Sequence, residues 1–236
     1  MTQPARAAEL DAVYRAQRLR LSAAVAARTA AIWTQLQGDQ PAALAQLIPV
    51  VEAGQSHVAS LVAAYMTAKA SEQGAQAVLT VDPARYTTEA LRGLPAAEVY
   101  SRPWGAFYKN LDAGVTRPQA TQSALASLDK LVRTDMQLAQ THSARDLMSN
   151  PEVGIVGWRR VLNGDTNCPL CTVASTRTYR IGDLMPIHEH CDCTVEPLWG
   201  TEPVTSVGTT VKVELDPELG PRLMASGWSS VGPRLL

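Results

Sequence analysis

All four cysteines of the 236-residue chain and two of its four histidines lie within residues 165–193, in the stretch DTNCPLCTVASTRTYRIGDLMPIHEHCDC. Cys168 and Cys171 form a Cys-x-x-Cys pair. Sixteen residues later the chain carries a second set of candidate ligands, His188, His190, Cys191 and Cys193. A Cys-x-x-Cys turn directs both sulfurs at one metal ion, and a second pair from a separate loop completes a tetrahedral zinc site. The spacing therefore predicts that this stretch binds Zn²⁺.

The stretch offers six candidate ligands for four coordination positions. Cys191 and Cys193 alternate along an extended segment and so share a face, while His188 can meet Cys191 across a tight turn. We prefer a site made by Cys168, Cys171, His188 and one of Cys191 or Cys193. Coordination by the four cysteines remains open, and His190 is expected to lie outside the ligand set.

A structural zinc ion competes with three other interpretations of these cysteines. Disulfides would suit an oxidising compartment, but the N-terminal sequence MTQPARAAELDAVYR has no apolar signal-peptide core, so we expect a cytosolic protein. Free thiols without metal are a second alternative. A catalytic zinc would need an open coordination position and a base, for which Glu189 or Asp192 could serve. A segment of short strands this small cannot bury enough surface alone, so we expect one zinc ion per chain that stabilises its fold.

The segment GWRRVLNGDTNCPLCTVASTRTYRIGDLMPIHEHCDCTVEP resembles the C-terminal motif of phage minor head proteins, the Mu F-like head morphogenesis family. The motif consists of a Trp, an Asp before Cys-x-x-Cys, a Gly, then Pro-x-His-x-x-Cys-x-Cys and a closing Pro. In this chain these positions are Trp158, Asp165, Cys168, Cys171, Gly182, Pro186, His188, Cys191, Cys193 and Pro197. The chain departs from the family at Glu189, where Pro is usual, and at Asp192, where Arg is usual, which bears on the ligand choice.

The resemblance implies a minor capsid protein of a tailed bacteriophage. Such a protein would be a structural component near the portal vertex, acting in head assembly and in DNA packaging or ejection. Its expected partners are the portal protein and the major capsid or scaffold protein, with packaged DNA as a further candidate. It would be found inside the virion, and in the host cytoplasm during assembly. No membrane partner and no small-molecule substrate are expected.

A capsid maturation protease is the first alternative function. Ser143 lies beside His142 in a predicted helix, but neighbours in a helix diverge by about 100°, so the pair is not expected to meet. His57 lies between Ser56 and Ser60 and is equally an ordinary helical residue. The chain has no Gly-x-Ser-x-Gly, His-Glu-x-x-His, phosphate-binding loop or dinucleotide fingerprint. We therefore expect a protein without catalytic residues.

A DNA-binding head protein is the second alternative. The formal net charge is −1, so no overall field attracts the chain to nucleic acid. Basic residues are locally enriched in the first predicted helix and beside the cysteine cluster. The candidate phosphate contacts are Arg15, Arg18, Arg20 and Arg28 in the helix, and Arg159 and Arg160 beside the cluster.

The rest of the chain predicts a mainly helical fold. Apolar residues follow a helical period over residues 5–36 and 118–148, with further helical blocks over residues 40–70 and 95–111. Gly38, Asp39 and Pro41 are typical of one helix ending and another beginning, and Pro49 predicts a kink or break near Ile48. The stripes on the first and last long helices predict a shared core that contains Trp33, Leu36, Leu125, Leu128 and Val132.

The chain is predicted to have three parts: an elongated helical domain over residues 1–150, a zinc-stapled α+β module over residues 151–200, and an extended tail over residues 201–236. The module should contain a strand over residues 156–161, followed by a turn at Asn163 and Gly164. In the last part, TTVKVEL alternates like an edge strand. The remaining tail is either frayed or an arm that docks on another subunit through Leu223, Met224, Trp228 and Leu235.

Overall fold

The computed structural model describes residues 3–162, 167, 169–183 and 193–200. Its α-helices are α1 (Gln3–Gln35), α2 (Gln40–Glu72), α3 (Thr88–Arg92), α4 (Ala96–Asp112), α5 (Arg117–Met148) and α6 (Pro169–Ala174). Three short 3-10 helices are η1 (Pro83–Tyr86), η2 (Pro151–Val153) and η3 (Ile181–Asp183). The strands are β1 (Ile155–Val161), β2 (Thr178–Tyr179) and β3 (Thr194–Trp199). The predicted mainly helical class is confirmed, with one small sheet.

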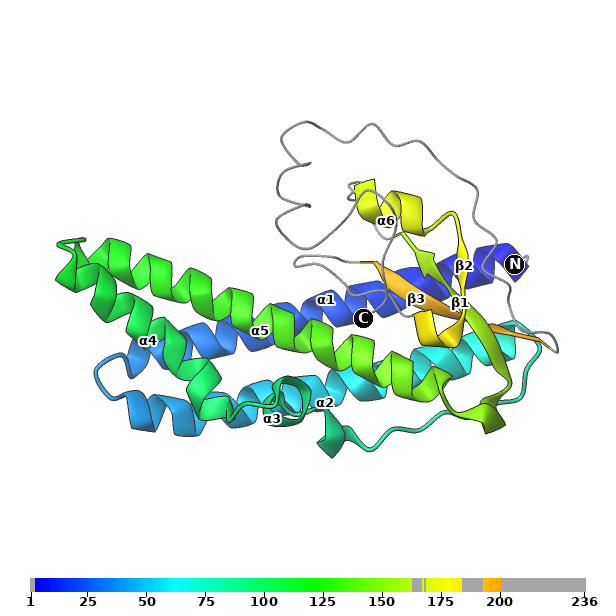
Figure 1. Cartoon of the computed structure of the whole chain (residues 1–236), viewed down its shortest axis with the longest axis horizontal. Helices are drawn as coiled ribbons and strands as arrows, with labels where there is room; N and C mark the ends of the chain where they lie inside the picture. The colour runs from blue at the N-terminus through cyan, green and yellow to red at the C-terminus, as the bar shows by residue number, and fades with distance from the viewer. Residues whose placement is uncertain (1–2, 163–166, 168, 184–192, 201–236) are drawn as a thin grey trace.

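The three long helices, α1, α2 and α5, run side by side along the long axis of the molecule (Figure 1). α4 packs against α5 and α2 at the end away from the sheet, and the sheet and α6 lie at the end that holds the N-terminus (Figure 1). The described part of the chain is therefore an elongated bundle that carries a sheet at one end.

Two hydrophobic cores follow one another along this bundle. The first lies among α1, α2, α4 and α5, with Trp33 packing against Trp104 and Phe107 at ring-centroid distances of 5.4 and 5.7 Å. The second joins the other ends of α1, α2 and α5 to the sheet, through Tyr14, Val62, Tyr65, Met66, Leu147, Met148, Ile155, Trp158 and Val195. Because this second core is shared, the sheet buries its apolar side chains together with those of the helices.

The core predicted from the helical stripes is confirmed. Trp33, Leu128 and Val132 are buried in the first core, and Leu36 and Leu125 are partly buried against it. The residues share a core because their periodic positions place them on the sides of α1 and α5 that face α2 and α4.

The boundaries of the long helices follow local signals, with one exception. Asp39 caps α2, since its side-chain Oδ1 accepts a hydrogen bond from the Ala42 amide at 3.1 Å. Of the kink or break predicted near Ile48, the break is wrong, because α2 continues through Pro49. Pro49 and Ala45 both lie on the exposed side of α2, so solvent can hydrate the Ala45 carbonyl that lacks its helical donor, and the buried residues on either side hold the helix together.

The sheet has the strand order β2-β1-β3, and β1 pairs antiparallel with both neighbours. In the β1–β3 ladder Arg159 lies opposite Glu196, and Arg160 lies opposite Val195. Successive residues of a strand point to opposite faces, so Arg159 and Arg160 serve different sides of the sheet. The predicted strand over residues 156–161 is thus confirmed. The predicted turn at residues 163–164, the edge strand TTVKVEL and the docking arm lie outside the described residues.

The long apolar helix α2 would be able to cross a membrane by length and composition alone. A core helix of a bundle has the same two properties. α2 contacts α1, α4, α5 and β3 along its length, so its apolar character is accounted for by packing within this chain.

A glycine marks the closest approach of the long helices. A Cβ built on Gly54 of α2 would lie 2.7 Å from Cγ2 of Val25 in α1 and 3.0 Å from Cε of Met136 in α5. The β-branched Val25 is stiff, so it cannot move aside cheaply. Gly54→Ala should therefore destabilise the protein by about 1 kcal/mol, because an overpacking cost of roughly 1–3 kcal/mol outweighs a gain in helix propensity of about 1 kcal/mol.

Gly105 in α4 supplies the matched control for this prediction. It is also inside a helix, but a Cβ there meets nothing within 4 Å. Gly105→Ala should therefore stabilise the protein by up to about 1 kcal/mol through propensity alone. Urea unfolding of both variants checks the pair. If Gly54→Ala is as stable as Gly105→Ala, the three helices do not pack as tightly as described.

Candidate functional site

Two of the five predicted zinc ligands lie together in the structure. Cys171 in α6 and Cys193, directly before β3, are 2% and 4% exposed and form one small cluster, with Leu162 packed against it. Val161 and Thr194 pair at this end of the β1–β3 ladder, which brings Cys193 beside the end of β1. Folding therefore brings together two thiols from the two halves of the predicted motif.

The other predicted ligands, Cys168, His188 and Cys191, lie outside the described residues. Among the described residues no group of three or more His, Cys, Asp or Glu side chains is arranged to hold a metal ion. Two thiolates fit zinc by donor chemistry, but they are only half of a tetrahedral set. The zinc site thus stays a prediction, and Cys171 and Cys193 are its two located members.

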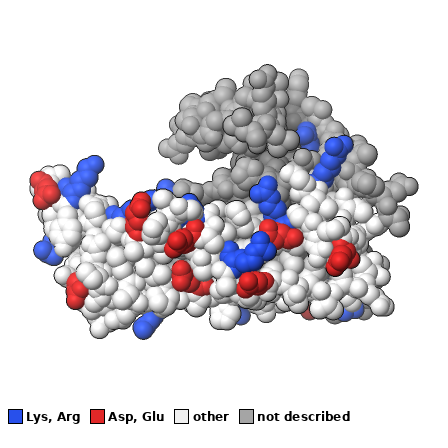
Figure 2. Space-filling view, turned by 60° about the horizontal axis from the view of Figure 1, so that its bottom comes forward, with Lys and Arg blue, Asp and Glu red and all other residues white. Residues whose placement is uncertain are grey.

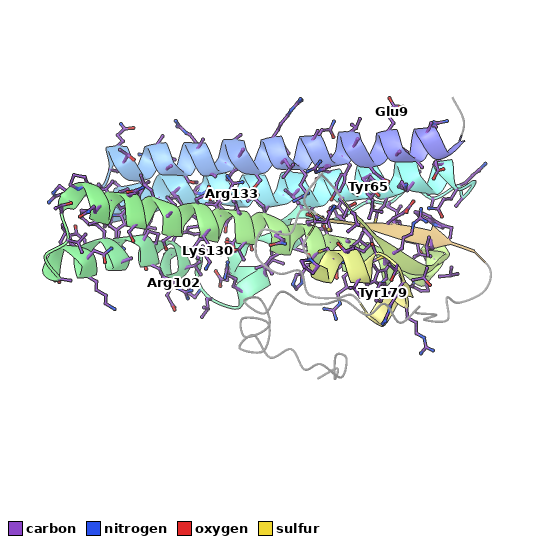
Figure 3. The ribbon with its side chains drawn as sticks, turned by 90° about the horizontal axis from the view of Figure 1, so that it is seen from above. Glu9, Tyr65, Arg102, Lys130, Arg133 and Tyr179 are labelled. Atoms are coloured by element: carbon purple, nitrogen blue, oxygen red, sulfur yellow. The ribbon has the colours of Figure 1, made fainter. Side chains whose placement is uncertain are left out.

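A buried cluster of charged residues lies on the opposite face of the sheet. Lys69 of α2 is fully buried, with its Nζ atom 2.6 Å from Oε1 of Glu196 in β3 and 3.3 Å from Oδ1 of Asp11 in α1. Arg159 of β1 pairs with the second carboxylate oxygen of Glu196. The Tyr65 hydroxyl donates a 2.8 Å hydrogen bond to Asp11. These contacts link the two helices to the sheet at the end of the bundle where Tyr65 lies (Figure 3).

The pKa directions follow from this arrangement. Burial alone would raise the pKa of Glu196, but hydrogen bonds from Arg159 and Lys69, together with their positive charges, outweigh burial and hold the pKa below its usual value. The pKa of Arg159 is raised, chiefly by its hydrogen bond to Glu196. Burial, and then the neighbouring Asp11 carboxylate, raise the pKa of the Tyr65 hydroxyl well above its usual value. At neutral pH these pKa shifts keep Glu196 and Arg159 charged and Tyr65 neutral.

Hydrogen bonds between side chains and the backbone add to the attachment of the sheet. At the end of α2, Gln73 Nε2 donates to the Pro197 carbonyl at 3.0 Å, and Gln73 Oε1 accepts from the Trp199 amide at 3.3 Å. The Trp199 indole donates to the Val153 carbonyl at 3.0 Å. β3 is therefore attached to the bundle by main-chain contacts as well as by ion pairs.

A second buried carboxylate, Asp135 of α5, connects the helices in the middle of the bundle. It accepts hydrogen bonds from Arg92 Nε and the Tyr100 hydroxyl, both at 2.5 Å, and from the Thr88 hydroxyl at 2.9 Å. The Thr88 hydroxyl also lies 3.2 Å from Oε1 of Gln55, so its single proton is shared between this amide oxygen and Asp135. With its donors all provided by the protein, this cluster is a structural one.

The candidate nucleic-acid contacts do not form one exposed basic surface. Arg18 and Arg160 are 7% and 4% exposed, Arg15 is half-buried, and Arg159 pairs with Glu196. Arg20 and Arg28 are exposed on α1. On the face shown in Figure 2, basic and acidic side chains lie intermixed. The predicted positions therefore give the DNA-binding interpretation little support.

Sequence reasoning missed the charged cluster around Lys69 and the one around Asp135. Lys69 is an isolated charge in the apolar run LVAAYMTAKA of a helix, which is a signal that it needs a buried partner. Glu196 follows the cysteine stretch and carries no comparable signal. Only the tertiary fold shows that these two residues meet.

Protonation of the Glu196 carboxylate at acidic pH should lower the stability of the protein. At neutral pH, Glu196→Gln should cost about 3 kcal/mol, because Lys69 and Arg159 lose a buried partner. A lowered folded-state pKa means that this contribution is present above the usual glutamate pKa of about 4.3 and disappears as the pH falls through the lower folded-state value. The difference between wild type and variant should therefore shrink toward pH 3.

Glu9→Gln is the control for this experiment, because Glu9 is an exposed residue of α1 that points away from the bundle (Figure 3). Its unfolding midpoint should match that of wild type across the same pH range. Urea unfolding at several pH values measures all three proteins. A gap for Glu196→Gln that stays constant down to pH 3 would contradict the assignment of the charged carboxylate to this cluster.

Comparison with known proteins assigns the chain to a family. No curated protein and no solved structure matches it. A family model described as VG15 protein matches residues 1–212, which includes the long helices, the sheet and the whole cysteine stretch. The match spans most of the chain, so it covers the bundle and its attached sheet as one unit. The chain therefore belongs to the VG15 protein family, a family of viral (phage) proteins.

Proposed function

We propose that this chain is a minor capsid, or head morphogenesis, protein of a tailed bacteriophage. It acts as a structural component near the portal vertex, in head assembly and in DNA packaging or ejection. Its partners are the portal protein and the major capsid or scaffold protein. Its place is inside the virion, and in the host cytoplasm during assembly.

The observation that carries this proposal is membership of a viral protein family over residues 1–212, in a chain with the Cys/His motif of phage minor head proteins. The geometry is compatible with the motif, because Cys171 and Cys193, from its two halves, lie in one buried cluster. The motif Trp158 is fully buried, stacks on Tyr179 at 4.4 Å and donates to the Arg180 carbonyl at 2.9 Å. Trp158, Cys171 and Cys193 of the motif are thus packed inside the fold.

The proposed cofactor is one structural zinc ion. Cys171 and Cys193 would hold it, with the remaining ligands drawn from Cys168, His188 and Cys191. A bound zinc ion would cross-link the α6 segment to the start of β3 and so add folding free energy. No open position for substrate is proposed.

The buried polar groups favour a structural role over a protease. The Ser143 hydroxyl is buried and donates to the Ala139 carbonyl at 2.7 Å, as an ordinary helical serine does. His57 is exposed on α2, and the neighbouring Ser60 hydroxyl donates to the Ser56 carbonyl. These groups form no nucleophile–base pair. Loss of scaffold cleavage in Ser143→Ala or His57→Ala, on co-expression with scaffold and capsid subunits, would instead support the protease.

Localisation in the virion tests the structural proposal. Virions of the phage that encodes this chain should contain it in a few copies per head, in the fraction that holds the portal, as measured by quantitative mass spectrometry. An infected-cell lysate and a tail fraction serve as controls. Recovery of the chain only from the lysate, with none in purified heads, would reject a minor capsid role.

Zinc content is a separate prediction. Purified, reduced wild-type protein should contain about one zinc ion per chain, and Cys171→Ser should lose it, because a thiolate ligand is removed. The helices should remain, since their first core includes no residue of α6 or of the sheet. Elemental analysis with circular dichroism measures both quantities.

Limited proteolysis around Arg177 and Arg180 completes this test. Chelation of zinc should accelerate cleavage there in wild type and leave cleavage of Cys171→Ser unchanged. Less than about a tenth of an equivalent of zinc, with cleavage that ignores the chelator, would return the cysteines to disulfides or free thiols.

A further inference from the structure

A stretch of extended backbone lies between α2 and η1. Residues 75–82 contain no turn or bend, and they run back along the bundle from the end that holds the sheet (Figure 1). Their side chains alternate in burial: Leu79 is 6% exposed and packs in the second core, whereas Val78 is 84% exposed. A β-strand has the same two-residue alternation, so this stretch has the geometry of a strand, although none of the described strands pairs with it.

The main-chain groups along one edge of this stretch have no partner. The Leu79 amide donates a 3.0 Å hydrogen bond to Thr67 Oγ1 of α2, so its own edge faces α2. Successive amides of an extended chain point to opposite edges, which turns those of Gln76, Val78 and Thr80 away from Thr67. Within the described part of the chain, the amides and carbonyls of these three exposed residues make no hydrogen bond. Such an edge is a template for one further strand.

The size of this edge favours a strand that is tethered to the same chain over a separate partner. Stable interfaces between separate chains use about 20–30 residues a side, whereas this edge offers only residues 76–81. A tethered segment has an effective concentration of about 1 mM, so a few main-chain hydrogen bonds are enough to hold it in place.

The chain that follows β3 starts beside this edge. The Trp199 amide donates to Oε1 of Gln73, which lies three residues before Gln76, and residues 201–236 follow Gly200. Within them TTVKVEL, residues 209–215, alternates β-branched and apolar side chains with polar ones. The linking residues 201–208 can span about 26 Å when extended, which exceeds the length of the edge, about 20 Å. The segment can therefore reach either end of the edge.

We propose that residues 209–215 add to the free edge of residues 76–81 as a β-strand of the same molecule. The two strands form a second small sheet, in which the amides and carbonyls of Gln76, Val78 and Thr80 gain partners. Val78, on the outer face, gains a cross-strand neighbour that covers part of its side chain. Neither the zinc ion nor the virion role enters this contact, so the inference goes beyond the proposed function and does not depend on it.

Amide-resolved hydrogen exchange by NMR tests this contact in the full chain. The amides of Gln76, Val78 and Thr80 should exchange at least about tenfold more slowly in wild type than in the double variant Val211→Pro/Lys212→Pro. Two adjacent prolines remove one donor from each edge of the added strand, so they break the pairing in either register.

Two controls accompany this variant. Thr205→Pro/Ser206→Pro places both prolines in the linking residues and should exchange like wild type. The Leu79 amide should stay protected in every protein, because Thr67 binds it, and it therefore reports that the bundle is folded.

A change on the edge itself gives the converse test. Val78→Pro removes the central donor and should speed exchange of residues 209–215 by a similar factor. Val78→Thr keeps both the amide and a β-branched side chain, so exchange in that segment should stay as in wild type.

Three results would overturn the inference. Equally fast exchange of the three edge amides in all proteins would mean that nothing covers the edge. Slow exchange that persists in Val211→Pro/Lys212→Pro would mean that another segment covers it. Slow exchange that disappears on dilution would assign the added strand to a second copy of the chain. None of these results bears on fractionation of phage particles, so this inference and the proposed function fail separately.

Discussion

The buried ion pair between Lys69 and Glu196 is the constraint on which the arrangement of the sheet and the bundle depends. A fully buried ammonium group needs a carboxylate, and here it has two, one from α1 and one from β3. Arg159 neutralises what remains of the Glu196 charge. The ion pairs therefore fix the register of β3 against α2 more narrowly than apolar packing would, because a shifted strand would leave a buried charge without its partner.

The two cores stabilise different ends of the molecule. Far from the sheet, aromatic packing around Trp33 and close helix contact at Gly54 hold four helices in place. Near the sheet, α4 is absent and the strands take over as the covering layer. α2 passes through both regions, which explains why it is apolar along most of its length. A single long helix thus connects the core around Trp33 to the core that it shares with the sheet.

Local signals predicted the local structure. The apolar stripes located the long helices to within a few residues, and the Gly38–Pro41 stretch located the turn between the first two. The break at Pro49 failed, because buried neighbours outweigh one missing donor. The spacing of the cysteines predicted that Cys171 and Cys193 would lie at one site, and they form one cluster. The pairing of Lys69 with Glu196 depends on contacts between distant segments, which no local sequence pattern encodes. The exposure of the basic residues is likewise decided by tertiary packing, which buries Arg18 and Arg160 and leaves Arg20 and Arg28 exposed.

The late position of Glu196 in the sequence has a consequence for synthesis on the ribosome. α1 and α2 emerge first and can pair as a helical hairpin, but Lys69 then faces water at the unfinished end of that hairpin. Its carboxylate partner on β3 becomes available only after α5 and the cysteine stretch have been made. The nascent chain can therefore close its first core early and must keep the second open until β3 leaves the exit tunnel. A chain interrupted before β3 would carry an unfinished end that host proteases and chaperones can recognise.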